Sequence, residues 1–160
     1  MKAIIQRVNY ARVKVEGEIK GEIGKGFLIL LGVEKGDDRA DAEYMAEKCT
    51  GLRIFEDENG KMNLPLSEVG GKILAISNFT LCGDCRKGKR PSFINAELPN
   101  EANELYEYFV RQCRARGIET ETGVFRAHMH VELENNGPVT LIVDSREANL
   151  SGMPIRKGMK

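Results

Sequence analysis

The sequence predicts an α+β protein: a single domain with a curved, barrel-like, mostly antiparallel sheet and two main helices. Apolar residues that alternate with polar ones, or form short unbroken runs, occupy both ends of the chain. Two segments between them change to the period of an amphipathic helix. With 160 residues the chain is long enough for one domain with its own hydrophobic core. The order of these segments does not repeat the strand-helix-strand unit of a parallel sheet.

The first third of the chain predicts strands. A short apolar run covers residues 3–8, and Val13 and Val15 then alternate with charged residues up to a turn around Glu16-Gly17-Glu18. Residues 26–33, GFLILLGV, are apolar without a break, which is typical of a strand buried on both faces.

The first helix is expected after Asp37 or Asp38, either of which can cap it, and it ends near Gly51. Its apolar stripe consists of Ala42, Met45, Ala46 and Cys49. Residues 52–64 then predict a hairpin that turns at Asn59-Gly60. Residues 70–81 predict another buried strand.

Residues 82–99 contain glycine, proline and charge without a period, so we expect a long surface loop, and loops of this length are usually functional. The second helix follows and stops at Gly117. Its apolar stripe consists of Ala102, Leu105, Phe109, Val110 and Cys113.

Two last strands are expected at residues 127–133 and 139–144, separated by a turn in NNGPVT (135–140). The folded domain should therefore span residues 1–146. Residues 147–160 carry neither period nor a set of core residues, and we expect a mobile C-terminal tail.

Composition excludes several classes of protein. Lysine plus arginine equals aspartate plus glutamate, 24 each, so the chain lacks the basic excess of a bulk nucleic-acid or membrane binder. No stretch is apolar enough to cross a membrane, and the start lacks the features of a signal peptide, which predicts a cytoplasmic protein. Four sparse cysteines, two of them in predicted helices, favour free thiols over disulfides.

The sequence offers candidates for two kinds of site, a metal site and a catalytic nucleophile. Cys82, Cys85, His128 and His130 supply the residue types of a zinc site, but their spacing is unlike that of a compact finger, so loop cysteines and surface histidines are favoured. Ser77 and Thr80 follow a buried strand, where nucleophiles are often presented. No base is identifiable beside them, and a strand-end hydroxyl bonded to nearby backbone is the simpler interpretation.

Two further stretches suggest binding. Arg86, Lys87, Lys89 and Arg90 crowd into five positions, and in an otherwise neutral chain they are the evident place for a phosphate backbone to dock, although such runs are usually only solvated loops. Most X-Pro peptide bonds in folded proteins are trans, so a trans turn is the default expectation for Gly137-Pro138. If it is cis, its two carbonyls can point the same way and form a rigid polar edge.

Five segments together carry a family resemblance. The motifs SNFTL, KGKRPSF, ELYEYF, TGVF and NNGPVTLIVDS, in this order and spacing and with the early IQRV, resemble the D-aminoacyl-tRNA deacylases, formerly D-tyrosyl-tRNA(Tyr) deacylases. The likeness runs from Met1 to about Arg146.

The resemblance implies a homodimer that hydrolyses the ester of D-aminoacyl-tRNA as a proofreading step in translation, without metal or cofactor. Its active sites lie at the subunit interface. By carry-over, Ser77, Phe79 and Thr80 form the reaction-side motif, Gly137 and Pro138 of the other subunit form a chirality gate, and Arg7 steadies that gate. A gate that rejects L side chains by clash cannot reject glycine, so glycyl-tRNA should also be cleaved. The family is understood to use the terminal 2′-hydroxyl of the tRNA to activate water, with Thr80 as a positioning group.

This chain departs from the family pattern at two places. Asn78 stands where the family usually has glutamine, and Arg126 replaces the glycine of Phe-Gly-Ala, between Phe125 and Ala127. The resemblance places the terminal adenine near that stretch and Met129, so Arg126 crowds the pocket or adds a stacking or phosphate contact. Two other functions stay open: a zinc-dependent RNA-binding module, and a small-molecule esterase with Thr80 as nucleophile.

Overall fold

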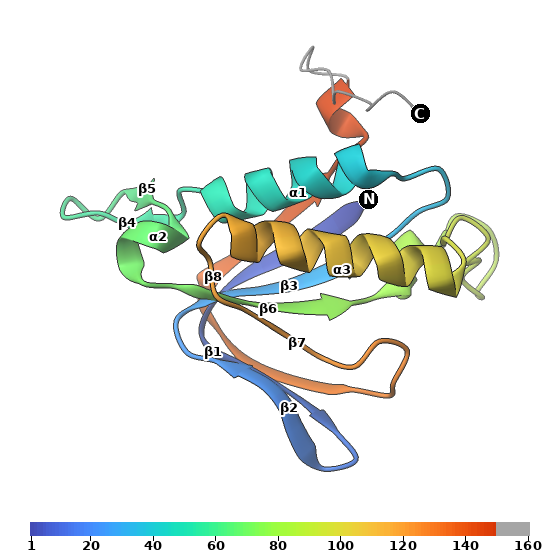
Figure 1. Ribbon diagram of the computed structural model, residues 1–160, viewed down its shortest axis with the longest axis horizontal. Helices are drawn as coiled ribbons and strands as arrows, with labels where there is room; N and C mark the ends of the chain where they lie inside the picture. Colours follow the sequence, from blue (N-terminus) through green and yellow to red (C-terminus); the bar gives the residue numbers. More distant parts are fainter. Residues whose placement is uncertain (150–160) are drawn as a thin grey trace.

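The computed structural model describes residues 1–149 and contains one main sheet of six strands. Its strands are β1 (Lys2–Val15), β2 (Glu18–Ile23), β3 (Gly26–Gly32), β6 (Lys72–Ser77), β7 (Thr120–Thr122) and β8 (His130–Asp144). They are ordered β2-β1-β3-β6-β7, and β8 pairs with the free side of β1 (Figure 1). The predicted α+β domain with a curved, barrel-like sheet is confirmed. The two predicted strand segments within residues 3–15 are one long strand, β1.

Part of this sheet is parallel. β1 pairs antiparallel with β2, β3 and β8, whereas β3 with β6 and β6 with β7 pair in parallel. The inference that the chain lacks strand-helix-strand units was therefore wrong. Parallel neighbours need a crossover connection, and here α1 (Arg39–Gly51) lies between β3 and β6 in sequence and α3 (Pro99–Ala115) between β6 and β7.

Both long helices cover the same face of the sheet and pack side by side (Figure 1). Each presents its apolar stripe to that face. The main core lies between these layers and includes the fully buried Phe27, Ile29, Ile73, Met45 and Phe109.

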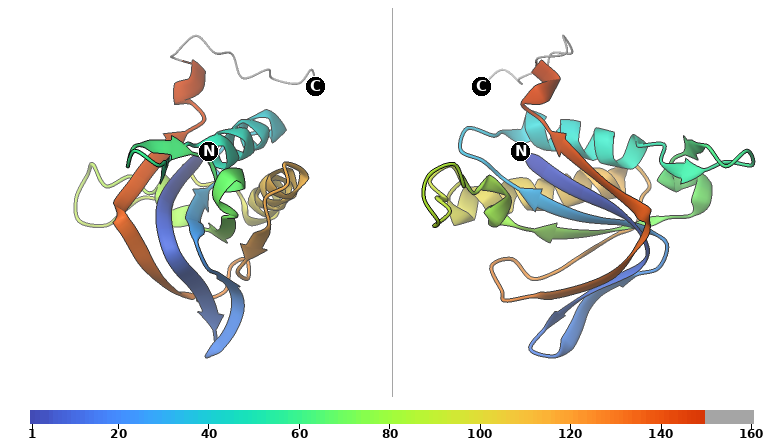
Figure 2. Two further views of the ribbon diagram at one scale, coloured as in Figure 1. Left: turned by 90° about the vertical axis from the view of Figure 1, so that its left-hand side faces the viewer. Right: turned by 180° about the vertical axis from the view of Figure 1, so that it is seen from behind.

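The opposite face of the sheet curls on itself, as seen in Figure 2. β2 returns close to the end of β7, since an added Cβ at Gly21 would lie 2.5 Å from the carbonyl oxygen of Thr122. A second, smaller core fills this curl and contains Val8, Val13, Leu28, Leu74 and Ile76, with Leu30, Met129, Val131 and Leu133 packed at its open side. This open side becomes the candidate site.

The helix predictions are confirmed. Asp38 caps α1, accepting from the backbone N–H groups of Ala40 and Asp41, and the Asp41 side chain accepts from the Asp38 N–H. Of the predicted α3 stripe, Phe109, Val110 and Cys113 are buried, and Tyr106 joins them. Gly117 follows α3 with φ +82°, as expected of a C-terminal glycine.

The remaining elements are short. The predicted hairpin consists of β4 (Phe55–Glu56) and β5 (Met62–Leu64), and α2 (Leu66–Val69), which we did not predict, leads into β6. Phe79–Cys82 form a 3₁₀ helix, η1, so the strand predicted over residues 70–81 is shorter than expected. Glu147–Asn149 form a second such turn, η2, and the rest of the predicted tail, residues 150–160, lies outside the described residues.

The predicted turn in NNGPVT was wrong, because β8 runs through it as one strand. Residues 136–139 are looped out opposite Arg7: Gln6 pairs with Thr140, and the next pair is Val8 with Asn135. The Asn135 side-chain amide donates to the carbonyl oxygens of Arg7 and Val139, 3.2 and 2.9 Å away, and so bridges the gap in the ladder. The Gly137-Pro138 peptide bond in this bulge is cis.

Within residues 1–149 no helix is long and apolar enough to span a membrane.

Candidate functional site

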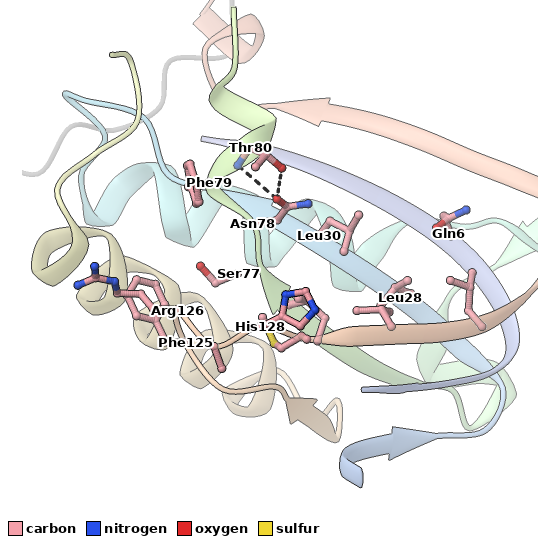
Figure 3. A pocket seen from close by; sticks show the side chains of 15 residues that line it. Gln6, Leu28, Leu30, Ser77, Asn78, Phe79, Thr80, Phe125, Arg126 and His128 are labelled. Atoms are coloured by element: carbon pink, nitrogen blue, oxygen red, sulfur yellow. Dashed lines mark hydrogen bonds between the residues drawn. The ribbon is translucent and has the colours of Figure 1, made fainter. Parts of the chain in front are cut away.

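The candidate site is a cavity of about 510 Å³ at the open side of the curl (Figure 3). Its apolar walls come from β3, β6 and the start of β8, and its polar groups gather where β6 ends. The lining residues are Gln6, Leu28, Leu30, Ile76, Ser77, Asn78, Phe79, Thr80, Phe125, Arg126, Ala127, His128, Met129, Val131 and Leu133.

The structure brings together seven of the site residues predicted from the sequence. Ser77, Asn78, Phe79 and Thr80 line this cavity from one side, and Phe125, Ala127 and Met129 line it from the other. The other predicted residues do not line it. Arg7, Gly137 and Pro138 lie on the β1–β8 bulge, and Arg86, Lys87, Lys89 and Arg90 lie in the long loop.

Thr80 is placed by the short helix η1. Asn78 caps this helix, with its side-chain oxygen accepting from the Thr80 N–H at 3.2 Å and also from the Thr80 hydroxyl. An amide oxygen orients a hydroxyl but does not remove its proton, so this arrangement positions Thr80 without activating it as a nucleophile.

Phe79 connects the cavity to the long loop. Its side chain is 57% exposed, and its ring lies edge-on against Phe93 with 5.2 Å between centroids. The loop is pinched at its base by hydrogen bonds in both directions between Asp84 and Ser92. The basic residues therefore project from a loop anchored next to the cavity.

All four basic residues of this loop are exposed. Arg86 is held by Asp84 through Nε–Oδ1 and Nη2–Oδ2 contacts of 2.9 and 2.7 Å. These hydrogen bonds lower the pKa of Asp84 to about 2. Arg86 is thus partly neutralised, whereas Lys87, Lys89 and Arg90 form no ion pair with any residue from 1 to 149.

Phe125 and Ala127 belong to a turn, in which the Ala127 N–H donates to the Val124 carbonyl oxygen at 3.1 Å. The strand predicted from Ala127 starts only at His130, because this turn occupies its expected beginning. Arg126 has φ +65°, in the left-handed region that costs residues with a Cβ atom.

Sequence reasoning missed Gln6, Leu28, Leu30 and His128 as cavity residues. Alternation had assigned His128 to the polar face opposite Met129. Since β8 begins only after both residues, alternation does not apply to them, and both reach the cavity. No signal in the sequence places His128 near SNFTL, and only the fold brings them together.

The chemistry of this cavity is limited by what lines it. Its lining contains one histidine, His128, and no aspartate or glutamate. The His128 ring lies edge-on against the His130 ring, with 5.0 Å between centroids, and has no hydrogen-bond or ion-pair partner within residues 1–149. The site can bind and orient a substrate with an apolar part, but it holds no Ser/Thr-His-carboxylate arrangement.

Gly137 and Pro138 are exposed on the bulge, and Arg7 holds the bulge from below. The Arg7 side chain is only 5% exposed and donates to the carbonyl oxygens of Asn136 at 3.2 Å and Ile54 at 2.7 Å. It forms no ion pair within residues 1–149. A Cβ on Gly137 would meet Val139 at 2.7 Å and Arg7 Nη2 at 3.1 Å, so the bulge fits tightly over this guanidinium.

An apolar row extends from the cavity across the sheet. Register pairs Ile142 with Ile4, Ile4 with Leu30, and Leu30 with Ile76, so the four side chains share one face. Ile76 is buried at the cavity, but Ile142 at the far end is 74% exposed.

The alternative zinc site finds no geometric support. Cys82 is buried and donates to the Val33 carbonyl oxygen, and burial raises the pKa of its thiol to about 11. Cys85 is exposed. In the part of the chain that the structure describes, no group of three or more histidine, cysteine, aspartate or glutamate side chains is placed to hold a metal.

Known proteins with similar sequences and folds indicate the family to which this chain belongs. The model of the family "D-Tyr-tRNA(Tyr) deacylase" matches residues 4–144. A D-aminoacyl-tRNA deacylase of Koribacter versatilis is 60% identical over 147 residues, which cover 92% of this chain and 99% of that protein. One from Pelobacter propionicus is 58% identical over 144 residues, covering 90% and 99%.

Among solved structures, one titled "c-Myc DNA Unwinding Element Binding Protein" superposes with a TM-score of 0.85 and 38% identity, covering 90% of this chain and 98% of that one. The sequence, the fold and the cavity agree with these matches. The chain belongs to the D-Tyr-tRNA(Tyr) deacylase family.

Proposed function

We propose that this protein is a cytoplasmic proofreading hydrolase that cleaves the ester of D-aminoacyl-tRNA to free tRNA and the D-amino acid. It works as a homodimer in which Gly137-Pro138 of each subunit closes the cavity of the other. The observation that best supports this proposal is that Gly137 and Pro138 are exposed and do not line the cavity of their own chain. That cavity is open at its mouth.

The apolar row supports the dimer. It continues from the cavity wall to Ile142, which lies on β8, the strand that also carries the bulge. Burying Ile142 against a second copy removes a large apolar side chain from water, which stabilises association by about 1.5 to 3 kcal/mol per such residue. A two-fold contact over this row brings the bulge of one subunit toward the cavity of the other, and its symmetry makes two equivalent sites.

The gate selects by clash. In the closed site the main-chain oxygens of Gly137 and Pro138 face the substrate α-carbon, so that an L side chain collides with them and a D side chain points into free space. Arg7 keeps the bulge in place through Asn136, and main-chain atoms suit this task because they have no rotamers to adjust.

Catalysis depends on the substrate. The apolar walls, with Phe125, Ala127 and Met129, hold the terminal adenosine, while Ser77, Asn78, Phe79 and Thr80 hold the ester. The terminal 2′-hydroxyl of the tRNA then helps to activate the attacking water, which suits a cavity lined by no carboxylate. The tRNA body docks on the exposed loop cations Arg86, Lys87, Lys89 and Arg90.

The direct test is to incubate the purified protein with the same tRNA charged with either enantiomer of one amino acid, in the presence of EDTA. We expect loss of the D ester and retention of the L ester. A chelator-sensitive reaction would support a metal-dependent enzyme instead. Cleavage of simple aryl esters at a similar rate, without tRNA, would support the small-molecule esterase.

Glycyl-tRNA provides a second test of the clash. Glycine has no side chain for the gate to reject, so we expect glycyl-tRNA to be hydrolysed, unlike L-alanyl-tRNA, which differs by one methyl group. The measurement is the rate of ester loss for both substrates over a range of enzyme concentrations. Complete resistance of glycyl-tRNA at high enzyme would show that selection does not depend on excluding a side chain.

A further inference from the structure

A second cavity of about 380 Å³ lies beside the first, between α3 and residues 122–125. The α3 residues that line it include Asn103, Glu107, Arg111 and Arg114, spaced by three or four positions along one helix face. Neither the sequence reasoning nor the proposed reaction uses this cavity.

The two cavities share Phe125 as a wall. Its ring stacks on Tyr106, with 6.2 Å between centroids and 28° between planes. The Tyr106 hydroxyl donates to the Ala75 carbonyl oxygen at 2.6 Å, in the middle of β6. The wall is therefore anchored to the sheet, and the two cavities lie on either side of Phe125.

The second cavity carries unused positive charge. Arg114 directs Nε and Nη2 to the Thr120 carbonyl oxygen, at 3.1 and 2.7 Å, which leaves its Nη1 without a partner in residues 1–149. The Arg111 guanidinium lies over the Tyr108 ring, 5.7 Å from its centroid, and has no hydrogen-bond or ion-pair partner in residues 1–149. Glu107 is the only carboxylate in the lining, so the two guanidinium groups outnumber it.

Asn103 adds an unused acceptor. Its amide nitrogen donates to Glu107 at 3.3 Å, but its side-chain oxygen is buried and has no partner in residues 1–149. A buried amide oxygen without a donor is uncommon in native proteins and calls for a ligand or water. A ribose 2′-hydroxyl is such a donor, and it is present in RNA and absent from DNA.

Arg126 stands at the rim next to this shared wall. It is exposed, forms no ion pair within residues 1–149, and in Figure 3 its guanidinium points away from Ser77 and His128. Its left-handed backbone is unfavourable for an arginine. It does not crowd the first cavity, and it extends toward solvent where a phosphate can reach it.

We propose that Arg126 and the second cavity bind the ribose-phosphate backbone of the nucleotides that precede the terminal adenosine of the tRNA. Arg126 contacts the phosphate at the rim, Arg111 and Arg114 contact the next one, and Asn103 accepts from a ribose hydroxyl. This inference rests on the proposed function, because the terminal adenosine must occupy the first cavity.

The experiment compares two substrates that share the reacting ester: D-aminoacyl-tRNA, and D-aminoacyl-adenosine, which lacks all upstream phosphates. The variants are Arg111→Ala and Arg126→Asn, since asparagine tolerates a left-handed backbone and carries no charge. The control is Arg116→Ala, at the end of the same helix but outside the cavity lining. Arg114 is left intact because it also holds Thr120.

For the tRNA substrate, each variant should raise KM by about tenfold with little change in kcat, as expected for one lost charge-assisted phosphate contact. Each should also reduce the slope of log KM against log salt by about 0.7. For D-aminoacyl-adenosine, no change is expected with Arg111→Ala or with the control variant, and Arg126→Asn, at the rim of the first cavity, should cause a smaller loss than it does for the tRNA. Arg126→Lys should recover most of the affinity.

Equal losses on both substrates, or no loss on the tRNA, would overturn the inference, because the effect would then be unrelated to upstream phosphates. If the unmodified protein cleaves neither substrate, the proposed function fails and this inference fails with it. Unchanged thermal melting of the variants separates lost contacts from lost folding.

Discussion

Replacing Gly137 with alanine should lower kcat/KM for D-aminoacyl-tRNA by about 100-fold, the typical cost of moving a positioning group by about 1 Å. The added Cβ would lie 2.7 Å from Val139 Cγ2, 2.9 Å from Val139 N and 3.1 Å from Arg7 Nη2. The residue also has φ +134°, a conformation that alanine rarely adopts. The bulge must therefore shift, and the gate shifts with it.

A matched control is Gly60→Ala, in the β4–β5 turn. Gly60 also has positive φ, +72°, but its added Cβ would meet nothing within 4 Å, and it lines neither cavity. Both variants strain the backbone, so only a loss specific to Gly137→Ala indicates a role in the reaction. Steady-state kinetics with the D ester, with thermal melting of both proteins, provide the measurement.

Mixed dimers test whether the gate acts across subunits. One chain carries Gly137→Val, which disables the gate, and the other carries Ala127→Trp, which fills the cavity. Random pairing of equal amounts makes half of the dimers mixed, and each mixed dimer has one intact site of two, so the mixture should recover about one quarter of normal activity. Purification tags belong at the C-terminus, since the Met1 amino group is buried against Ser145 and Asp37.

A mixture as inactive as its two parents would contradict a shared site. So would full activity of a protein that light scattering shows to be a monomer at the assay concentration.

A tRNA that ends in 2′-deoxyadenosine and is charged on the 3′-hydroxyl should be hydrolysed about 10² to 10⁴ times more slowly, the usual contribution of a general base. The reason lies in the cavity, whose lining contains no carboxylate and only one histidine. Removing the 2′-hydroxyl thus removes the group proposed to activate water. Single-turnover rates at saturating enzyme measure this effect without interference from binding.

Thr80→Ala is the matched change on the protein side. The Thr80 hydroxyl donates to the Asn78 amide oxygen, so it orients the ester and its loss should cost less than about tenfold. His128→Ala should also retain most activity, because the 2′-hydroxyl and not this imidazole is proposed to activate water. A trapped acyl-Thr80 intermediate, or an undiminished rate on the deoxy substrate, would transfer the chemistry to the protein.

The sequence by itself determined the local elements. Ala42, Met45, Ala46 and Cys49 lie on the buried face of α1, and Asp38 caps that helix, because both features depend on residues within one or two turns. The Glu16-Gly17 and Asn59-Gly60 turns follow in the same way from their glycines, which have φ +80° and +72° at little steric cost. The family resemblance also named seven of the fifteen cavity residues in advance.

Tertiary structure alone decided which residues meet. Parallel pairing of β3 with β6 joins segments about forty residues apart, and nothing in either segment specifies its neighbour. The continuity of β8 through Gly137-Pro138 depends on Asn135 bonding to Arg7, 128 positions away. His128 faces the cavity only because a turn delays the start of β8 until His130. Period and propensity act over a few residues, whereas register, bulges and the sides of a cavity are set by contacts between distant segments, so the site had to be observed in the folded chain.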